Sequence, residues 1–274
     1  MRIRTLVENH ANINRKDLGS EHGLSFLIEN QGHFFMSDVG QSGKFADNAA
    51  KLGVDISNVE ALAISHHHYD HGGGMGRFFE ENESARVYLR AAPDVDFVAT
   101  DNTDTVRYIG LDKGLLSDHA KRIVSITENR VIQPGLHLLV DIPDQYPKPG
   151  GDQRLKVRKG REMKPDPFEH ELVTVVEGQA GLVLLTGCAH NGVLNMIAAV
   201  RNAIPEKPIM AVIGGFHLHH ETPHRVHEIA DSLLSMEIPA IYSGHCTGEE
   251  AMAILQEVLG HRFHMLYTGL EITF

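Results

Sequence analysis

The segment SHHHYDHGGG, residues 65–74, places four histidines and an aspartate directly after a short apolar run, VEALAIS. The apolar run predicts a buried strand. Because side chains alternate along an extended chain, His66 and His68 point to one side and His67 points away. Two imidazoles on the same side of a strand exit can bind one metal ion. The spacing therefore predicts that His66 and His68 are two ligands of one metal.

The remaining polar residues of this segment, Asp70 and His71, are adjacent and begin the next helical turn. They are therefore aimed at a point beside the first metal, which predicts a second metal ion with these two ligands. Three glycines, 72–74, follow and allow the backbone to approach the site closely. The surplus of histidine in the chain, nineteen against six tyrosines and no tryptophan, also favours metal chemistry.

Each metal needs at least one more ligand, because no four- or five-coordinate zinc site is complete with two. Three later segments, GLVLLTGCAH, IMAVIGGFH and PAIYSGHCTG, each read as an apolar strand that ends in a histidine and precedes a helix. Ligands in open α/β layers gather at the carboxyl ends of strands. His190 and His245 are the expected further ligands. Nitrogen and carboxylate ligands suit Zn, Mn or Fe.

The elements that position these residues are predicted from apolar periodicity. Segments RIRTLV, SFLIE, HFFMS and RVYLR read as strands, and Asn30-Gln31-Gly32 suits a hairpin between the second and third. Helices are expected over about 42–52 and 74–82. Residues 141–169 are rich in Pro, Gly and charge, and we interpret them as a mobile flap within a single domain that spans residues 1–274.

Composition bounds the function. The chain has 274 residues, 42% hydrophobic and 22% charged, which is typical of a soluble globular protein, and no apolar run of ~18 residues that could span a bilayer. The N-terminal residues lack the features of a secretory signal, so a cytoplasmic location is expected. The net charge of −11 argues against nucleic acid as a partner. The basic segment RLKVRKGREMK, residues 154–164, is either a solvated loop or a positively charged surface that attracts an anionic substrate.

The motifs SHHHYDH, TGCAHNG and SGHCTG resemble those of the metallo-β-lactamase superfamily over the whole chain. EHGLSFLIE, SDVGQSG, GGFHL and GHCTG resemble more narrowly the branch of 7,8-dihydropterin-6-ylmethyl-4-(β-D-ribofuranosyl)aminobenzene 5'-phosphate synthase. The resemblance implies an α/β fold, a four-layer αββα sandwich with two sheets face to face and helices outside. It also implies two divalent metal ions, Zn first, with Mn or Fe as alternatives.

The resemblance further implies which residues hold each ion. The first would be bound by His66, His68 and His190, and the second by Asp70, His71 and His245. Asp38, at the end of an early strand, matches the family's structural aspartate that orients the histidine loop.

His217 marks a departure from the family pattern. Many members carry a bridging aspartate at the end of the strand between the two late histidines, yet this strand ends in IGGFHL. His217 would therefore either join the second metal or stay free to stabilise or protonate a substrate oxyanion. The two cysteines, Cys188 and Cys246, are expected to be small buried packing residues, although a sulfur near the metals could tune or bind them.

The leading hypothesis is an enzyme that performs metal-assisted chemistry on a small anionic molecule bearing phosphate or pyrophosphate. Asp70 would orient the attacking group and His217 would steady developing negative charge. The branch resemblance implies a condensation that expels pyrophosphate from a pterin. Alternatives with the same site are a phosphodiesterase or nuclease and a lactonase or thioesterase; a non-catalytic metal-binding protein is a different class. No membrane partner is expected, and a homo-oligomer is left open.

Overall fold

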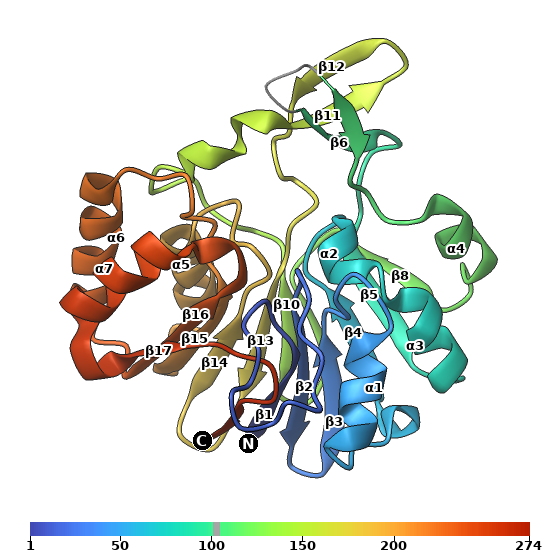
Figure 1. The fold of residues 1–274 in the computed structure, drawn as a ribbon, viewed down its shortest axis with the longest axis horizontal. Helices are drawn as coiled ribbons and strands as arrows, with labels where there is room; N and C mark the ends of the chain where they lie inside the picture. The colour runs from blue at the N-terminus through green and yellow to red at the C-terminus, as the bar shows by residue number, and fades with distance from the viewer. Residues whose placement is uncertain (101–104) are drawn as a thin grey trace.

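The computed structural model describes residues 1–100 and 105–274, and within them it contains two seven-stranded sheets and one four-stranded sheet (Figure 1). The first large sheet has the order β18-β1-β2-β3-β4-β5-β8. Its strands are β1 (Arg2–Val7), β2 (Ser25–Asn30), β3 (His33–Ser37), β4 (Ala61–Ile64), β5 (Arg86–Arg90), β8 (Ile123–Ile126) and β18 (Glu271–Thr273).

The second large sheet has the order β17-β16-β15-β14-β13-β10-β9. Its strands are β9 (Arg130–Gln133), β10 (Leu136–Leu139), β13 (Val173–Glu177), β14 (Leu182–Leu185), β15 (Ile209–Gly215), β16 (Ala240–Gly244) and β17 (Phe263–Met265). The strands β14 to β17 run parallel, as do β3, β4, β5 and β8 in the first sheet. Parallel strands deliver their carboxyl ends to one edge.

Helices connect many of these strands and lie outside the two large sheets (Figure 1). They are α1 (Lys44–Lys51), α2 (Tyr69–Gly72), α3 (Met75–Glu81), α4 (Lys113–Asp118), α5 (Val193–Ala203), α6 (Pro223–Ser235) and α7 (Glu249–Leu259). Short 3₁₀ turns are η1 (Ile56–Asn58), η2 (Gly150–Arg154), η3 (His245–Thr247) and η4 (Gly260–Arg262). No helix in the described ranges has the length and apolar character needed to cross a membrane.

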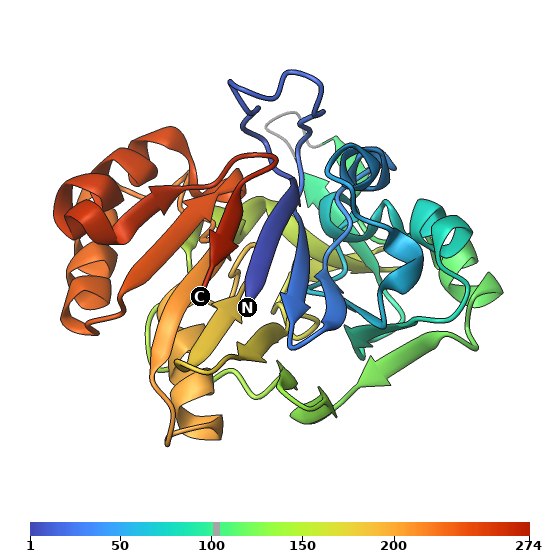
Figure 2. The same cartoon turned by 90° about the horizontal axis from the view of Figure 1, so that it is seen from below.

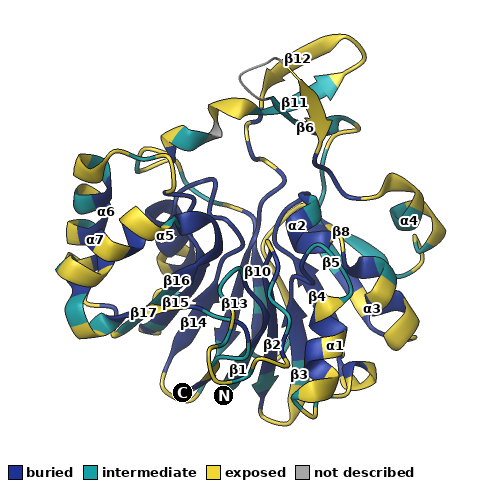
Figure 3. Ribbon diagram, in the orientation of Figure 1, coloured by how far each residue is buried: buried dark blue, intermediate teal, exposed yellow. Residues whose placement is uncertain are grey.

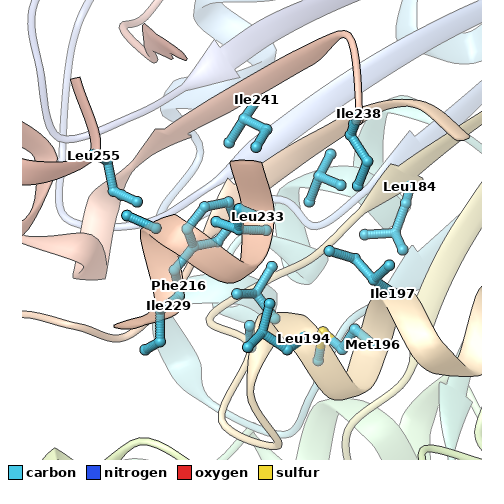
Figure 4. Packing of buried hydrophobic residues seen from close by; sticks show 14 of the residues in the cluster. Leu184, Leu194, Met196, Ile197, Phe216, Ile229, Leu233, Ile238, Ile241 and Leu255 are labelled. Carbon is cyan, nitrogen blue, oxygen red and sulfur yellow. The ribbon is translucent and has the colours of Figure 1, made fainter. Parts of the chain in front are cut away.

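Strands that are apolar on both faces explain the four layers. Along β14, Leu182 and Leu184 pack with the helices α5, α6 and α7, whereas Val183 and Leu185 face the first sheet. Figure 4 shows the core on the helix side, where Leu184 lies next to Ile197 and Leu233 belongs to the same cluster. Because such a strand is buried on both faces, its sequence is a continuous apolar run and does not alternate between apolar and polar residues.

The first sheet repeats this arrangement. Leu62 of β4 packs with Phe45 of α1 and Phe78 of α3, whereas Ala61 belongs to the core between the sheets. Figure 2 shows the two sheets edge on, with one set of helices on each side, and Figure 3 shows buried residues concentrated between the layers. The expected αββα sandwich is confirmed.

A small third sheet covers the edge where the parallel strands end (Figure 1). Its order is β12-β11-β6-β7, and its strands are β6 (Asp96–Thr100), β7 (Val106–Tyr108), β11 (Leu155–Lys159) and β12 (Glu162–Pro165). The segment 141–169, expected to be a flap without regular structure, thus contains the hairpin β11–β12. Its mobility stays a prediction. Polar strands exposed on much of their surface lack the apolar periodicity that would have indicated them.

Candidate metal centre

The predicted ligands gather beneath the small sheet. The chain leaves β4 at Ser65 and enters the histidine segment, and His190, His217 and His245 follow β14, β15 and β16. All of these strand ends meet at one edge because β14, β15 and β16 are parallel neighbours and β4 lies in the facing sheet. Residues far apart in sequence therefore lie together at this edge.

The first cluster consists of His66, His68 and His190, whose candidate ligand atoms lie within 4.8 Å of one another. Three donors about 2.1 Å from one tetrahedral zinc ion are themselves about 3.4 Å apart, so small side-chain adjustments suffice. The Nε2 atoms of His66 and His68 are buried and have no hydrogen-bond partner among the described residues. Burial, assisted by the charges of neighbouring histidines, lowers the pKa of both imidazoles well below the usual range. Neutral imidazoles with orphaned buried nitrogens fit a metal ion.

The second cluster brings together Asp70, His71, His245 and also Cys188 within the same 4.8 Å. His71 Nε2 lies 3.2 Å from His245 Nε2, and Asp70 Oδ2 lies 3.3 Å from His245 Nε2. Burial would raise the pKa of Asp70, but the charge on His71 and the hydrogen bond from His22 hold it well below its usual range. An ionised carboxylate between two imidazoles is a donor set that suits a divalent cation.

Cys188 belongs to this second cluster by position. Its Sγ is 3.1 Å from His71 Nε2, and burial raises the pKa of its thiol. Both cysteines are buried, as expected. The sequence had left open that a sulfur could contact the metals, and for Cys188 the geometry brings the sulfur into the ligand cluster.

Asp38 connects the first sheet to the histidine segment. Its Oδ1 accepts a hydrogen bond from Ser65 N at 2.7 Å, and its Oδ2 accepts from Ser65 Oγ at 2.8 Å and lies 2.7 Å from His71 Nδ1. Burial would lower the pKa of His71, but the charges of Asp38 and Asp70 raise it to about 9. Because Nδ1 is held by Asp38, Nε2 of His71 faces the second cluster.

His245 is oriented by residues of the N-terminal segment. Its Nδ1 lies 2.9 Å from Asn9 Oδ1, and its backbone N–H donates to the buried carboxylate of Glu8. Glu8 also pairs with His10 Nδ1 at 2.8 Å. Neither Glu8 nor Asn9 could be found from the sequence, because no local pattern links them to His245, which is 236 positions after Asn9.

Glu171 performs the same role for His190. It is fully buried, and its carboxylate accepts hydrogen bonds from His190 N, Asn191 N and Asn191 Nδ2, each at 2.8 Å. From the sequence alone, a place near the site and a place facing solvent were equally open for Glu171. The one indication in the sequence that Glu171 is buried is its place directly before the apolar run that forms β13.

The histidine that points away from the metals is also fixed. His67 Nε2 lies 2.8 Å from the carbonyl oxygen of Arg90, and its backbone N–H donates to His170 Nδ1 at 3.0 Å. His170 Nε2 lies 3.1 Å from Asp166 Oδ2. Since both ring nitrogens of His170 are engaged, His170 supports the backbone between His66 and His68.

His217 lies beside both clusters. Its candidate ligand atom is within 4.8 Å of those of Cys188 and His190, its ring centroid is 4.3 Å from that of His190, and it interacts with the thiol of Cys246. Its φ of 50° is shared by few non-glycine residues, and Asp38, Ala189 and His245 at the same edge also have positive φ. Such backbone strain concentrates at functional sites.

The glycines near the site allow close approach of neighbouring segments. A Cβ on Gly187 would lie 2.1 Å from Ser65 Oγ and 3.1 Å from His66 Nδ1, so the loop after β14 reaches the histidine segment only with glycine there. Gly73 and Gly74 contact the backbone of residues 39–42 instead of the ligand clusters. They let α2 and α3 pack on the turn that follows Asp38.

A cavity of about 340 Å³, hereafter the inner cavity, opens onto the clusters. His68, Asp70, His190, His217 and His245 line it on the metal side. Apolar Ile109 and Leu155 lie on the side of the small sheet. A small molecule that enters can therefore contact both clusters at once.

Comparison with known proteins agrees with this geometry. The family model of the metallo-β-lactamase superfamily matches residues 18–245. The chain belongs to this superfamily. The superfamily's fold implies binding of divalent metal, and the two clusters supply the residues for it.

Individual relatives of the superfamily cover the whole chain. A 7,8-dihydropterin-6-methyl-4-(beta-D-ribofuranosyl)-aminobenzene-5'-phosphate synthase from Methanocaldococcus jannaschii is 28% identical over 100% of this chain and 97% of that protein. A crystal structure of a metal-dependent hydrolase of the β-lactamase superfamily matches with a TM-score of 0.85 and 28% identity over 100% of this chain and 99% of that one. Zn²⁺-bound PqqB from Methylobacterium extorquens, with a TM-score of 0.58, 12% identity and complete coverage of both chains, shares the fold.

Proposed function

We propose that the protein is a metalloenzyme with two divalent ions that acts on a phosphate- or pyrophosphate-bearing small molecule. The observation that carries the proposal is the adjacency of the two ligand clusters. The rings of His66 and His71, one from each cluster, are 4.2 Å apart between centroids. His66, His68 and His190 would hold the first ion, and Asp70, His71 and His245 the second, with Cys188 beside it.

Two ions held by these clusters would supply Lewis acidity to phosphoryl oxygens, and either a nucleophile or a neutralised leaving group. The side chains around them supply orientation. Asp38, Asn9 and Glu171 hold the ligand-bearing segments by hydrogen bonds. Ligands fixed in this way lose little mobility when an ion binds, so the affinity for the ion rises.

Asp70 and His217 face the inner cavity and are the residues that we propose to contact substrate. Asp70 is ionised and can accept a hydrogen bond from an attacking group. His217, whose ring centroid lies 4.3 Å from that of His190, can donate a hydrogen bond to an oxygen on which negative charge develops. In the absence of a bridging aspartate, we propose that His217 contacts the substrate and that Asp70 is the carboxylate of the second site.

The substrate class has support from one relative. The protein from Methanocaldococcus jannaschii that covers the whole chain is a synthase of a dihydropterin aminobenzene 5'-phosphate. For this chain, a condensation between a pterin pyrophosphate and a phosphorylated aromatic partner is therefore the specific form of the proposal. Expulsion of pyrophosphate would then place the leaving group at the ions.

A substrate panel tests the proposal with zinc-loaded protein. The panel contains bis(p-nitrophenyl) phosphate, an aryl lactone, an aryl thioester and a dihydropterin pyrophosphate with an aminobenzene acceptor. Turnover of a phosphorus substrate that is lost in Asp70→Asn supports the proposal. Exclusive turnover of the lactone or thioester would overturn the substrate class, and no turnover with any of them would overturn the proposed reactions.

A further inference from the structure

The inner cavity continues into a second hollow of about 350 Å³, hereafter the outer cavity, on the side of the small sheet. The two share Ala99, Arg107, Leu155, His217 and His219 as lining residues. A molecule that contacts the metal clusters can therefore extend into the outer cavity. The small sheet, which lies above the metal edge in Figure 1, forms one wall of both.

The outer cavity has a positive wall. Arg107 and Arg154 both line it, and none of its described lining residues carries a carboxylate. Among the described residues, neither arginine lies within 4.0 Å of an acidic side chain as an ion pair. By contrast, Arg158 on the same sheet is paired with Asp96 at 3.0 Å. In a chain with a net charge of −11, two guanidinium groups in one cavity that form no ion pair with a described carboxylate are a local exception.

Arg107 is held in place through the histidine segment itself. Its guanidinium lies over the ring of Tyr69, 5.3 Å from the centroid. Tyr69 N donates to Ile109 O at 2.9 Å, and His68 forms a bridge with Gly110. The strand β7 that carries Arg107 is therefore tied to the segment that carries the proposed metal ligands, which fixes the distance between the two sites.

Arg154 lies on the other side of β6, where it ends η2 directly before β11. Its Nη2 contacts His220 Nε2, and its carbonyl oxygen accepts from Thr100 Oγ1 at 3.3 Å. The preceding turn is anchored where Gly150 N donates to Glu221. Arg154, directly before β11, and Arg107 of β7 thus line one cavity, since β11 and β7 pair on opposite sides of β6.

We propose that Arg107 and Arg154 bind a phosphate monoester on the part of the substrate that does not react, while the reacting group lies at the metals. Guanidinium groups present parallel N–H donors that match phosphate oxygens, and phosphate monoesters carry the charge that two arginines balance. The inference rests on the proposed function and deepens it: the substrate carries two anionic ends, one for each cavity. The small sheet then selects substrates by the distant phosphate.

The test measures binding of ribose 5-phosphate, with ribose as the uncharged comparison, to the zinc-loaded full-length chain by calorimetry. We compare the wild type with the double variant Arg107→Gln/Arg154→Gln and with the control Arg161→Gln. Arg161 lies between β11 and β12 and lines neither cavity. We expect the double variant to weaken ribose 5-phosphate binding by about tenfold or more, because hydrogen bonds to charged groups are lost. Arg161→Gln should leave binding unchanged.

Removal of the metal distinguishes phosphate binding at the arginines from phosphate binding at the metal ions. After treatment with chelator, binding that persists and still depends on the arginines supports the proposal. Binding that vanishes with the metal, or that is equal in the wild type and the double variant, overturns it. Turnover of the chromogenic phosphodiester by the wild type is measured separately. If the wild type does not turn it over but binds ribose 5-phosphate through the arginines, the proposed reaction is overturned and the anion site is supported.

Discussion

His71 Nδ1 lies 2.7 Å from Asp38 Oδ2, so the orientation of a proposed metal ligand is set by a carboxylate from a neighbouring strand. Asp38 also accepts two hydrogen bonds from Ser65, the residue before the histidine segment. One carboxylate therefore fixes both the start of the segment and a ligand of the second cluster. This relationship makes Asp38 the first residue to vary.

We expect Asp38→Asn to weaken metal binding by about 10- to 100-fold, because the amide cannot accept all three hydrogen bonds that orient Ser65 and His71. Titration of the metal-free protein with zinc in competition with a chromogenic chelator measures this change. Asp55→Asn, at the exposed N-terminus of η1, is the matched control. Affinity equal to the wild type in Asp38→Asn would contradict the role given to this carboxylate.

Glu171→Gln should destabilise the protein by about 1–3 kcal/mol. The carboxylate accepts hydrogen bonds from three N–H groups, and in the variant the buried amide NH₂ would face some of these donors. Denaturant unfolding of chelated protein measures this free energy without a contribution from metal binding. The exposed neighbour provides the control variant Glu169→Gln. Equal midpoints for the wild type and Glu171→Gln would show that the buried carboxylate does not hold the His190 loop.

The stability of the protein should fall as the pH rises through about 9, because of His10. The hydrogen bond to buried Glu8, opposed in part by burial, raises the pKa of His10 from 6.5 to about 9. A raised pKa in the folded state contributes stability in full below about 6.5 and loses it as the pH passes 9. Unfolding free energies measured from pH 6 to 10 should decline less steeply in His10→Gln than in the wild type.

Glu249→Gln serves as the control for His10. It removes the exposed partner at 2.8 Å from His10 Nε2 and keeps Glu8, so most of the decline should remain. If His10→Gln and the wild type show the same slope, the buried pair is not the source of the pH dependence.

We expect His217→Ala to keep both metal ions and to lower turnover by about 100- to 1,000-fold, as when a donor to a developing oxyanion is removed. Metal analysis and steady-state kinetics on the same preparation measure the two effects. His224→Ala, an exposed histidine on α6, controls for general effects of losing an imidazole. Loss of one metal ion in His217→Ala would instead make His217 a ligand.

Much of the site could be predicted from the sequence because its signals are local. The alternation that placed His66 and His68 together depends only on an extended strand exit, and each of His190, His217 and His245 follows an apolar run. The hairpin and the strand–helix units were visible for the same reason: apolar residues on buried strands and helix faces form periodic patterns.

The supporting contacts could not be predicted, because they join residues with no local relation. Asn9 meets His245 only because β1 and the segment after β16 lie near one another in the folded chain. The small sheet was missed because β11 and β12 are largely polar and because β11 pairs with β6 across a long separation, as Leu155 with Ala99. Cys188 could be predicted to be buried but not to contact His71, since that contact depends on the packing of the two sheets.

The central claim is that the two clusters hold two divalent ions, and metal content per chain tests it most directly. Protein purified with zinc available, and measured by plasma mass spectrometry after gel filtration, should contain two ions per chain. His68→Ala and His245→Ala, one from each cluster, should each lose one. Fewer than about one ion per chain in the wild type, with neither variant changing that content, would contradict the account.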